Sequence, residues 1–233
     1  MNIAAEPYPF DFDPDCAALL IIDMQRDFLE PGGFGEMLGN DVSCLRRAIE
    51  PNVRLLTAWR AAKLQVIHTR EGHLPDLSDL PPAKKNRGLH AVRIGDNGPM
   101  GRILVRGERG HDIIPELYPR DGEPVIDKPG KGAFHGTDLQ EILRQSGIRQ
   151  LVVTGVTTEV CVSTTVREAN DRGYDCVILE DCVASYFPHF HTSSLEMTKA
   201  QSGIFGWISD SRHILAALEG RFAAPEFGRG SGS

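Results

Sequence analysis

One cysteine, Cys161, stands where the chain could activate it as a nucleophile. It follows an apolar run of strand length, 150–154, and lies at the start of a helical pattern, 160–171. A helix N-terminus carries partial positive charge, which lowers the pKa of a nearby thiol, and its unpaired N–H groups can stabilise an oxyanion. The competing interpretation is a small buried apolar cysteine, which suits Cys176 and Cys182.

Two charged residues close other apolar runs. Asp23 follows the run 17–22, and Lys128 ends a later one. A carboxylate or an ammonium at such a place needs a partner of opposite charge. Asp23 can act as a base, taking the thiol proton and returning one to a leaving nitrogen. The alternatives are a capping carboxylate and a surface lysine, and Asp27 and Lys131 are the rival charged residues.

Strands and helices alternate about six times along the chain. Strands are predicted at 17–22, 65–69, 123–126, 150–154, 175–179 and 204–208, and helices at 42–62, 137–145, 160–171, 189–200 and 210–218. This alternation predicts an α/β fold of three layers, α/β/α and Rossmann-like, with a central parallel sheet of about six strands. Ligands bind such sheets at the carboxyl ends of the strands, so Asp23, Lys128 and Cys161 should meet there.

Length and composition limit the class of protein. The 233 residues suit one domain, predicted at 1–222, followed by a flexible tail at 223–233 that contains GRGSGS. A net charge of −7 argues against nucleic-acid or anionic-membrane partners. The five cysteines include no CxxC pair, and no apolar run is long enough to span a membrane, which predicts a cytoplasmic protein with free thiols. The irregular segment 70–121 is expected to form a site wall or a subunit contact.

Several segments, in order, resemble those of the isochorismatase-like cysteine hydrolases. They are LLIIDMQRDF, HTRE, IDKPGKGAF, VTGVTTEVCV, REANDRGY and QSGIFG, and the resemblance extends over about 17–218. It implies an amide hydrolase with a triad of Cys161, Asp23 and Lys128. It also implies a cis peptide bond between Val156 and Thr157, with the backbone amides of Thr157 and Cys161 forming the oxyanion hole.

The resemblance also bears on metal binding. Some members of the family bind a metal through an Asp-x-His…His cluster after the second strand. Here that region contains His68 and His73 but lacks the aspartate pattern. We therefore expect no metal and no other cofactor.

Within the family, the chain is most similar to biuret hydrolases and neighbouring linear-ureide amidohydrolases. The segments DKPGKG, CVSTT, REANDRGY and QSGIFG carry this similarity. It implies a small ureide as substrate, biuret or triuret, with release of ammonia through a carbamoyl-cysteine intermediate. It further implies a homo-oligomer, a tetramer by resemblance. Its expected substrate-binding residues are Gln201, Lys131, Phe28, Phe34 and Phe134.

Three alternatives remain. Ureidoacrylate or N-carbamoylsarcosine amidohydrolases act on carboxylates, which call for an arginine clamp, and the candidates are Arg70, Arg87, Arg93 and Arg102. A non-catalytic binding module would lack a hyper-reactive Cys161. A nucleotide-binding α/β protein would carry GxGxxG or GxxxxGK[ST] after the first strand, and neither motif is present.

Overall fold

A single parallel sheet forms the centre of the molecule. The computed structural model describes residues 1–88 and 92–223, so the predicted tail lies, from residue 224 on, outside the described residues. The sheet has six strands in the order β10-β9-β8-β3-β4-β7, and every neighbouring pair is parallel. The strands are β3 (Ala17–Ile22), β4 (Gln65–Glu71), β7 (Val125–Lys128), β8 (Gln150–Val156), β9 (Asp175–Ala184) and β10 (Trp207–Ser209). The predicted parallel sheet of six strands is confirmed.

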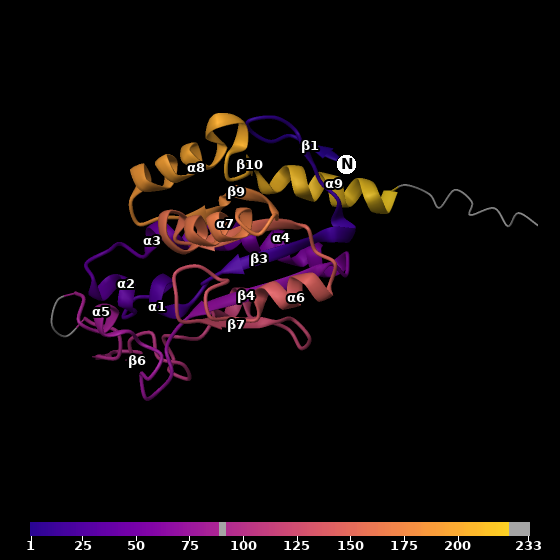
Figure 1. The fold of residues 1–233 in the computed structure, drawn as a ribbon. Helices are drawn as coiled ribbons and strands as arrows, with labels where there is room; N and C mark the ends of the chain where they lie inside the picture. The colour runs from indigo at the N-terminus through magenta and orange to yellow at the C-terminus, as the bar shows by residue number, and fades with distance from the viewer. Residues whose placement is uncertain (89–91, 224–233) are drawn as a thin grey trace, which may run out of the picture.

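Helices cover both faces of this sheet because its inner strands are apolar on both sides. In β3, Leu19 and Ile21 face one apolar cluster, and Leu20 and Ile22 face the other. The first cluster includes residues of α3 (Ser43–Arg46), α4 (Ile49–Ala61) and α9 (Ser211–Ala223), and the second those of α6 (Leu139–Gln145), α7 (Ser163–Asn170) and α8 (Pro188–Gly203). Figure 1 shows α6 and α7 on the near side of the strands. The predicted three-layer α/β/α fold is confirmed.

Short elements that the sequence pattern did not predict surround this core. They are β1 (Asn2–Ile3), β2 (Phe10–Asp11), η1 (Pro14–Cys16), α1 (Arg26–Leu29), α2 (Phe34–Met37), α5 (Pro82–Lys85), β5 (Asn97–Gly98), β6 (Gly101–Arg102) and η2 (Pro115–Leu117). Elements of two to four residues are too short to show a periodic pattern. In Figure 1, α5 and β6 lie near α1 and α2 at one end of the sheet. Two elements of the segment 70–121, α5 and β6, thus lie at that end.

Strands β3 and β8 approach each other closely where they end. Gly155 has a φ of +105°, and a Cβ atom built on it would lie 2.0 Å from the carbonyl oxygen of Ile22. Only glycine can adopt this conformation without strain and allow so close an approach. Because Asp23 follows Ile22 directly, this contact sets the distance between the ends of two strands that carry site residues.

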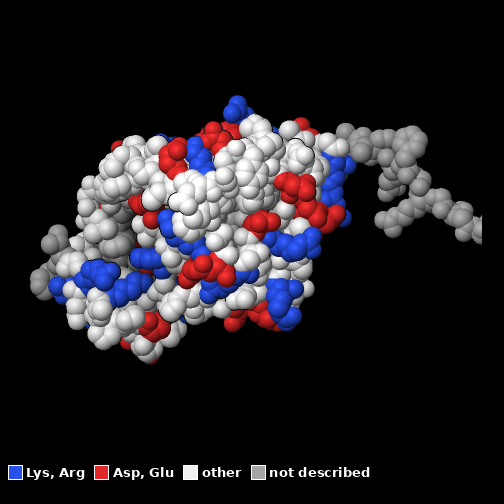
Figure 2. Space-filling model, turned by 45° about the horizontal axis from the view of Figure 1, so that its top comes forward, with Lys and Arg blue, Asp and Glu red and all other residues white. Residues whose placement is uncertain are grey.

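Two surface observations complete the description. Among the described residues, no helix combines the length and apolarity required to cross a bilayer. On the face shown in Figure 2, the basic and acidic side chains of the described residues are interspersed.

Candidate active site

Four reactive side chains meet at the carboxyl edge of the sheet. Lys128 Nζ lies 2.8 Å from Oδ2 of Asp23, and both side chains are fully buried. One side-chain donor atom each of Asp23, Glu71 and Cys161 lies within 4.8 Å of the other two. The structure therefore brings together Asp23, Lys128 and Cys161, as the strand-end rule predicts.

Backbone geometry and local hydrogen bonds fix the Asp23 carboxylate. Asp23 has a φ of 50°, a left-handed conformation that is costly for a residue other than glycine. The hydroxyl of Thr69 donates to Asp23 Oδ1 at 2.6 Å, and the Asp23 amide donates to the carbonyl of Thr69 at 3.2 Å. Thr69 of β4 therefore holds the strained Asp23 in position just after β3.

The Lys128 ammonium is held in the same way. It donates to the carbonyl oxygens of Gly130 at 3.0 Å and of Lys131 at 2.9 Å. With Asp23 as the ionic partner, these two acceptors satisfy an ammonium that has no access to water. The turn after β7 is therefore shaped around the charge of Lys128.

Glu71, the last residue of β4, is a site residue that the sequence analysis missed. The Cys161 thiol donates to Glu71 Oε2 at 3.6 Å, and the Lys131 ammonium donates to Oε1 at 2.7 Å. The Glu71 side chain is completely buried. The strand was predicted to end at Thr69, so the strand-end rule was applied two residues too early. Applied at the true end of β4, the same rule finds Glu71.

Lys84 of α5, which the sequence analysis did not identify, also contacts Glu71. Its Nζ lies 3.2 Å from Glu71 Oε1 and 3.1 Å from His73 Nε2, and it donates to the carbonyl of Pro129 at 2.6 Å. Nothing in the sequence around Lys84 marks it, because it comes from a four-residue helix inside the irregular segment.

The two histidines of the suspected metal region lie in separate groups. His73 Nδ1 is 3.2 Å from Asp79, whereas His68 Nε2 is 3.1 Å from Glu123. Among the described residues, the donor set with metal-like spacing is Asp23, Glu71 and Cys161. The ammonium groups of Lys128 and Lys131 already neutralise its two carboxylates at 2.8 and 2.7 Å. Such a set favours ion pairs over a divalent cation.

The electrostatics of the site differ from the helix-dipole prediction for Cys161. Burial, reinforced by the carboxylates of Asp23 and Glu71, raises the pKa of the thiol well above its ordinary value, although Lys128 and Lys131 oppose this. The expected lowering of the thiol pKa is therefore wrong, because desolvation and the two carboxylates outweigh the two ammonium groups. A thiol with a raised pKa needs a base if it is to act as a nucleophile.

In Glu71, unlike in Cys161, the neighbouring charges outweigh the effect of burial on the pKa. Burial by itself would raise its pKa, but the ammonium groups of Lys128, Lys131 and Lys84 lower it to about 2. The pKa of Lys128 is raised despite burial, chiefly because the Asp23 carboxylate, together with Glu71, favours its charged form. Three ammonium groups thus face two carboxylates, which leaves one positive charge beside the thiol.

A cavity of about 200 Å³ opens beside these groups. Its lining includes Cys161, Thr157 and Lys131, together with the predicted wall residues Phe28 and Phe34. The other lining residues are Gly35, Leu38, Asn40, Glu71, Val156, Glu159, Val160, Tyr186 and Phe187. A mostly apolar cavity with a few polar groups is typical of a small-molecule site.

The segment before Cys161 has the geometry expected from the resemblance. The peptide bond between Val156 and Thr157 is cis. From there the chain forms a π-helical turn, η3 (Thr158–Val162), which continues into α7. The predicted helix 160–171 therefore begins as a wider turn, a feature common at functional sites.

Two predicted substrate-binding residues do not line this cavity. Gln201 is exposed and lies in the kink of α8, where φ is 50° and the helix is interrupted. Phe134 is buried, and its ring stacks on Tyr174 with 5.9 Å between ring centroids. Their positions do not support the predicted substrate contact within one chain, because Gln201 lies on the surface and Phe134 packs in the core.

The arginine candidates for a carboxylate clamp are also placed elsewhere. Arg70 Nε donates to Asp127 at 2.7 Å, Arg93 to the carbonyl of Gly88 at 3.3 Å, and Arg102 to the carbonyl of Pro75 at 2.6 Å. Within residues 1–88 and 92–223, the cavity lining includes none of these three arginines and does not include Arg87.

Comparison with known proteins places this geometry in a family. The model of the isochorismatase domain matches residues 17–212. The chain belongs to the isochorismatase family. A ureidoacrylate amidohydrolase, RutB of Yersinia enterocolitica, is 34% identical to this chain over 215 residues, covering 90% of this chain and 92% of RutB.

Solved structures agree with this assignment. A cysteine hydrolase from Pseudomonas syringae pv. phaseolicola superposes with a TM-score of 0.76 at 26% identity, over 91% of this chain and 96% of that one. An N-carbamoylsarcosine amidase from Thermoplasma acidophilum shares the fold, with a TM-score of 0.63 at 24% identity, over 84% and 96% of the two chains. The predicted isochorismatase-like family and the predicted class, an amide-hydrolysing enzyme, are thus confirmed.

Proposed function

We propose that this isochorismatase-family enzyme hydrolyses a C–N bond of a small linear ureide, biuret or triuret, with release of ammonia. The observation that carries the proposal is the buried group of Cys161, Asp23 and Lys128 beside a cavity of about 200 Å³. A small polar diamide fits such a cavity, because its carbonyl groups can accept from Lys131 while its N–H groups face acceptors.

In the first half of the proposed reaction, Asp23 takes the proton of the Cys161 thiol. The resulting thiolate attacks a substrate carbonyl carbon, and the oxyanion is stabilised by the backbone amides of Thr157 and Cys161. Asp23 then returns the proton to the leaving nitrogen, the C–N bond breaks, and ammonia departs. The ammonium of Lys128, 2.8 Å from the Asp23 carboxylate, balances its charge at the start of this sequence.

In the second half, water hydrolyses the carbamoyl-cysteine thioester. Asp23 accepts a proton from the water, the hydroxide adds to the thioester carbonyl, and the C–S bond breaks with the proton returning to sulfur. Glu71 is the less suitable base for either half. Although it lies 3.6 Å from the sulfur, its pKa of about 2 makes it a poor proton acceptor.

A second candidate is an amidohydrolase acting on a ureide that carries a carboxylate, such as ureidoacrylate. The observation that favours it is the 34% identity with RutB. The absence of Arg70, Arg87, Arg93 and Arg102 from the described cavity lining counts against it. We therefore rank the uncharged ureides first.

One screen tests the proposal. Ammonia release is measured from biuret, triuret, ureidoacrylate, N-carbamoylsarcosine and nicotinamide, using wild type, Cys161→Ala and Cys161→Ser. Cys44→Ala is the matched control, because Cys44 is a free and partly exposed thiol. We expect wild type and the control to release ammonia from biuret or triuret, and both Cys161 variants to lose the activity. Wild-type activity in either Cys161 variant would show that the nucleophile is assigned wrongly.

The assembly and the location of the enzyme stay predictions. A homo-tetramer is expected from the family resemblance, and light scattering of the purified protein would test it. Cytoplasmic location is expected from the composition, and cell fractionation would test that.

A further inference from the structure

The cavity contains an acidic side chain that the reaction does not use. Glu159 lies two residues before Cys161 in η3 and lines the same cavity. Its Oε2 atom is buried and, among the described residues, has no hydrogen-bond partner. Glu159 as a whole is partly buried, and this inner oxygen is an acceptor that a ligand in the cavity can satisfy.

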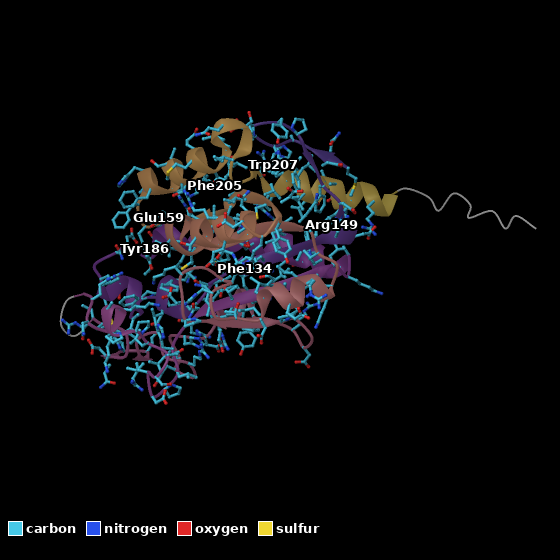
Figure 3. The ribbon with its side chains drawn as sticks, viewed as in Figure 1. Phe134, Arg149, Glu159, Tyr186, Phe205 and Trp207 are labelled. Carbon is cyan, nitrogen blue, oxygen red and sulfur yellow. The ribbon has the colours of Figure 1, made fainter. Side chains whose placement is uncertain are left out.

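Two polar side chains of the cavity lining, Lys131 and Tyr186, already have hydrogen-bond partners. Lys131, the only cation among the cavity-lining residues of the described chain, donates to Glu71 at 2.7 Å. The Tyr186 hydroxyl donates to the carbonyl of Phe28 at 2.8 Å. Figure 3 shows Glu159 and Tyr186 close together near α8, with Phe134 farther along the molecule. Neither group donates to Glu159, so its oxygen remains available to a substrate.

Apolar side chains also line the cavity with Glu159, namely those of Phe34, Leu38, Val156 and Val160. A carboxylate beside apolar surface discriminates by charge, because it is screened less than in bulk water. An N–H donor of a substrate satisfies Glu159, whereas a substrate carboxylate at the same place is repelled.

We infer that Glu159 is a specificity-determining residue that accepts a hydrogen bond from an N–H group at the end of the ureide remote from Cys161. It thereby selects uncharged ureides with a terminal amide over ureides that end in a carboxylate. A cationic end is disfavoured as well, because three ammonium groups already face only two carboxylates at the catalytic end. This inference rests on the proposed function and specifies its substrate class.

The test compares kcat/KM for biuret, ureidoacrylate and N-carbamoylputrescine, which end in an amide, a carboxylate and an ammonium group. The variants are Glu159→Gln, which is isosteric, and Glu159→Lys, which reverses the charge. Glu50→Gln is the control, because Glu50 is an exposed carboxylate on α4 whose side chain is 70% accessible. We expect Glu159→Gln to lower kcat/KM for biuret about tenfold, as loss of a charged hydrogen bond does. Glu159→Lys should reverse the preference between biuret and ureidoacrylate, and the control should leave it unchanged.

Binding provides a second measurement that does not depend on turnover. Biuret is titrated into Cys161→Ala and into Cys161→Ala with Glu159→Gln, and the double variant should bind about tenfold more weakly. The inference is overturned if wild type hydrolyses ureides but both Glu159 variants keep its substrate ratios within twofold. It is also overturned if N-carbamoylputrescine is the best substrate. Absence of ammonia release from every ureide by folded wild type would instead overturn the proposed function.

Discussion

The ammonium of Lys84 lies 3.2 Å from the carboxylate of Glu71, and this ion pair joins α5 to the strand end that faces Cys161. Lys84 also contacts His73 and the carbonyl of Pro129. An ammonium with three acceptors around it has a fixed position. We therefore regard Lys84 as a positioning residue, which acts on the reaction through Glu71.

Replacement of Lys84 tests this role. Lys84→Met should lower kcat/KM about tenfold, because Glu71 loses one of the three cations that hold it. It should also lower the free energy of unfolding by about 2 kcal/mol, since a largely buried ion pair loses one partner. The pKa of Glu71 should rise from about 2. Because protonation of Glu71 would break its contact with Lys131 beside the thiol, the acid limb of the pH–rate profile should move to higher pH.

The matched control for Lys84→Met is Lys85→Met. Lys85 is its exposed neighbour in α5. The Lys85→Met variant should leave both the pH–rate profile and the melting temperature unchanged. If the two variants lose the same activity with the same pH profile, Lys84 does not position Glu71.

A comparison of the two buried carboxylates tests which of them is the base. Asp23→Asn should lower kcat about 1000-fold, because loss of a general base costs that order of rate. Glu71→Gln should lower kcat only about tenfold, because its pKa of about 2 excludes it as an effective base. Single-turnover kinetics, with circular dichroism to confirm folding, measures both. A larger loss in folded Glu71→Gln than in folded Asp23→Asn would transfer the role of base to Glu71.

The alkylation of Cys161 should depend on pH in an unusual way for a nucleophile. Burial raises its pKa well above the ordinary value, so the thiolate is scarcer at neutral pH than in an ordinary cysteine and increases as the pH rises. Peptide mapping after iodoacetamide treatment should therefore show slower labelling of folded Cys161 at neutral pH than of the same peptide in denaturant. Rapid labelling at pH 7, with a midpoint below 8, would contradict the raised pKa.

The close contact between β3 and β8 should make Gly155 sensitive to substitution. Gly155→Ala should destabilise the protein by about 3 kcal/mol, since its Cβ would lie 2.0 Å from the carbonyl oxygen of Ile22. Gly147→Ala is the control, because Gly147 also has a positive φ, +66°, but has no atoms within 4 Å of its Cβ position. Gly147→Ala should lower the free energy of unfolding by only about 1 kcal/mol. If urea unfolding shows the same loss of unfolding free energy in both variants, the contact between β3 and β8 does not require glycine at position 155.

The sequence alone was sufficient for the sheet and for the placement of Asp23, Lys128 and Cys161 at one edge of it. Apolar runs such as 17–22 predict strands that are buried on both faces, as in a parallel sheet. In the structure every residue of β3 is buried. Because all such strands point the same way, their carboxyl ends meet, and the strand ends alone place Asp23, Lys128 and Cys161 together. The order of the motifs was specific enough to predict the family that the isochorismatase-domain match confirms.

Only the tertiary structure decided the environment of those residues. Lys84 and Glu159 reach the site from a four-residue helix and a π-helical turn, which no periodic pattern marks. The raised pKa of Cys161 reflects complete burial beside two carboxylates, a sum over neighbours that are distant in sequence. Local sequence fixes the type of each element and the side chains at its end. Burial and charge balance arise from contacts between elements, and the folded structure alone reveals them.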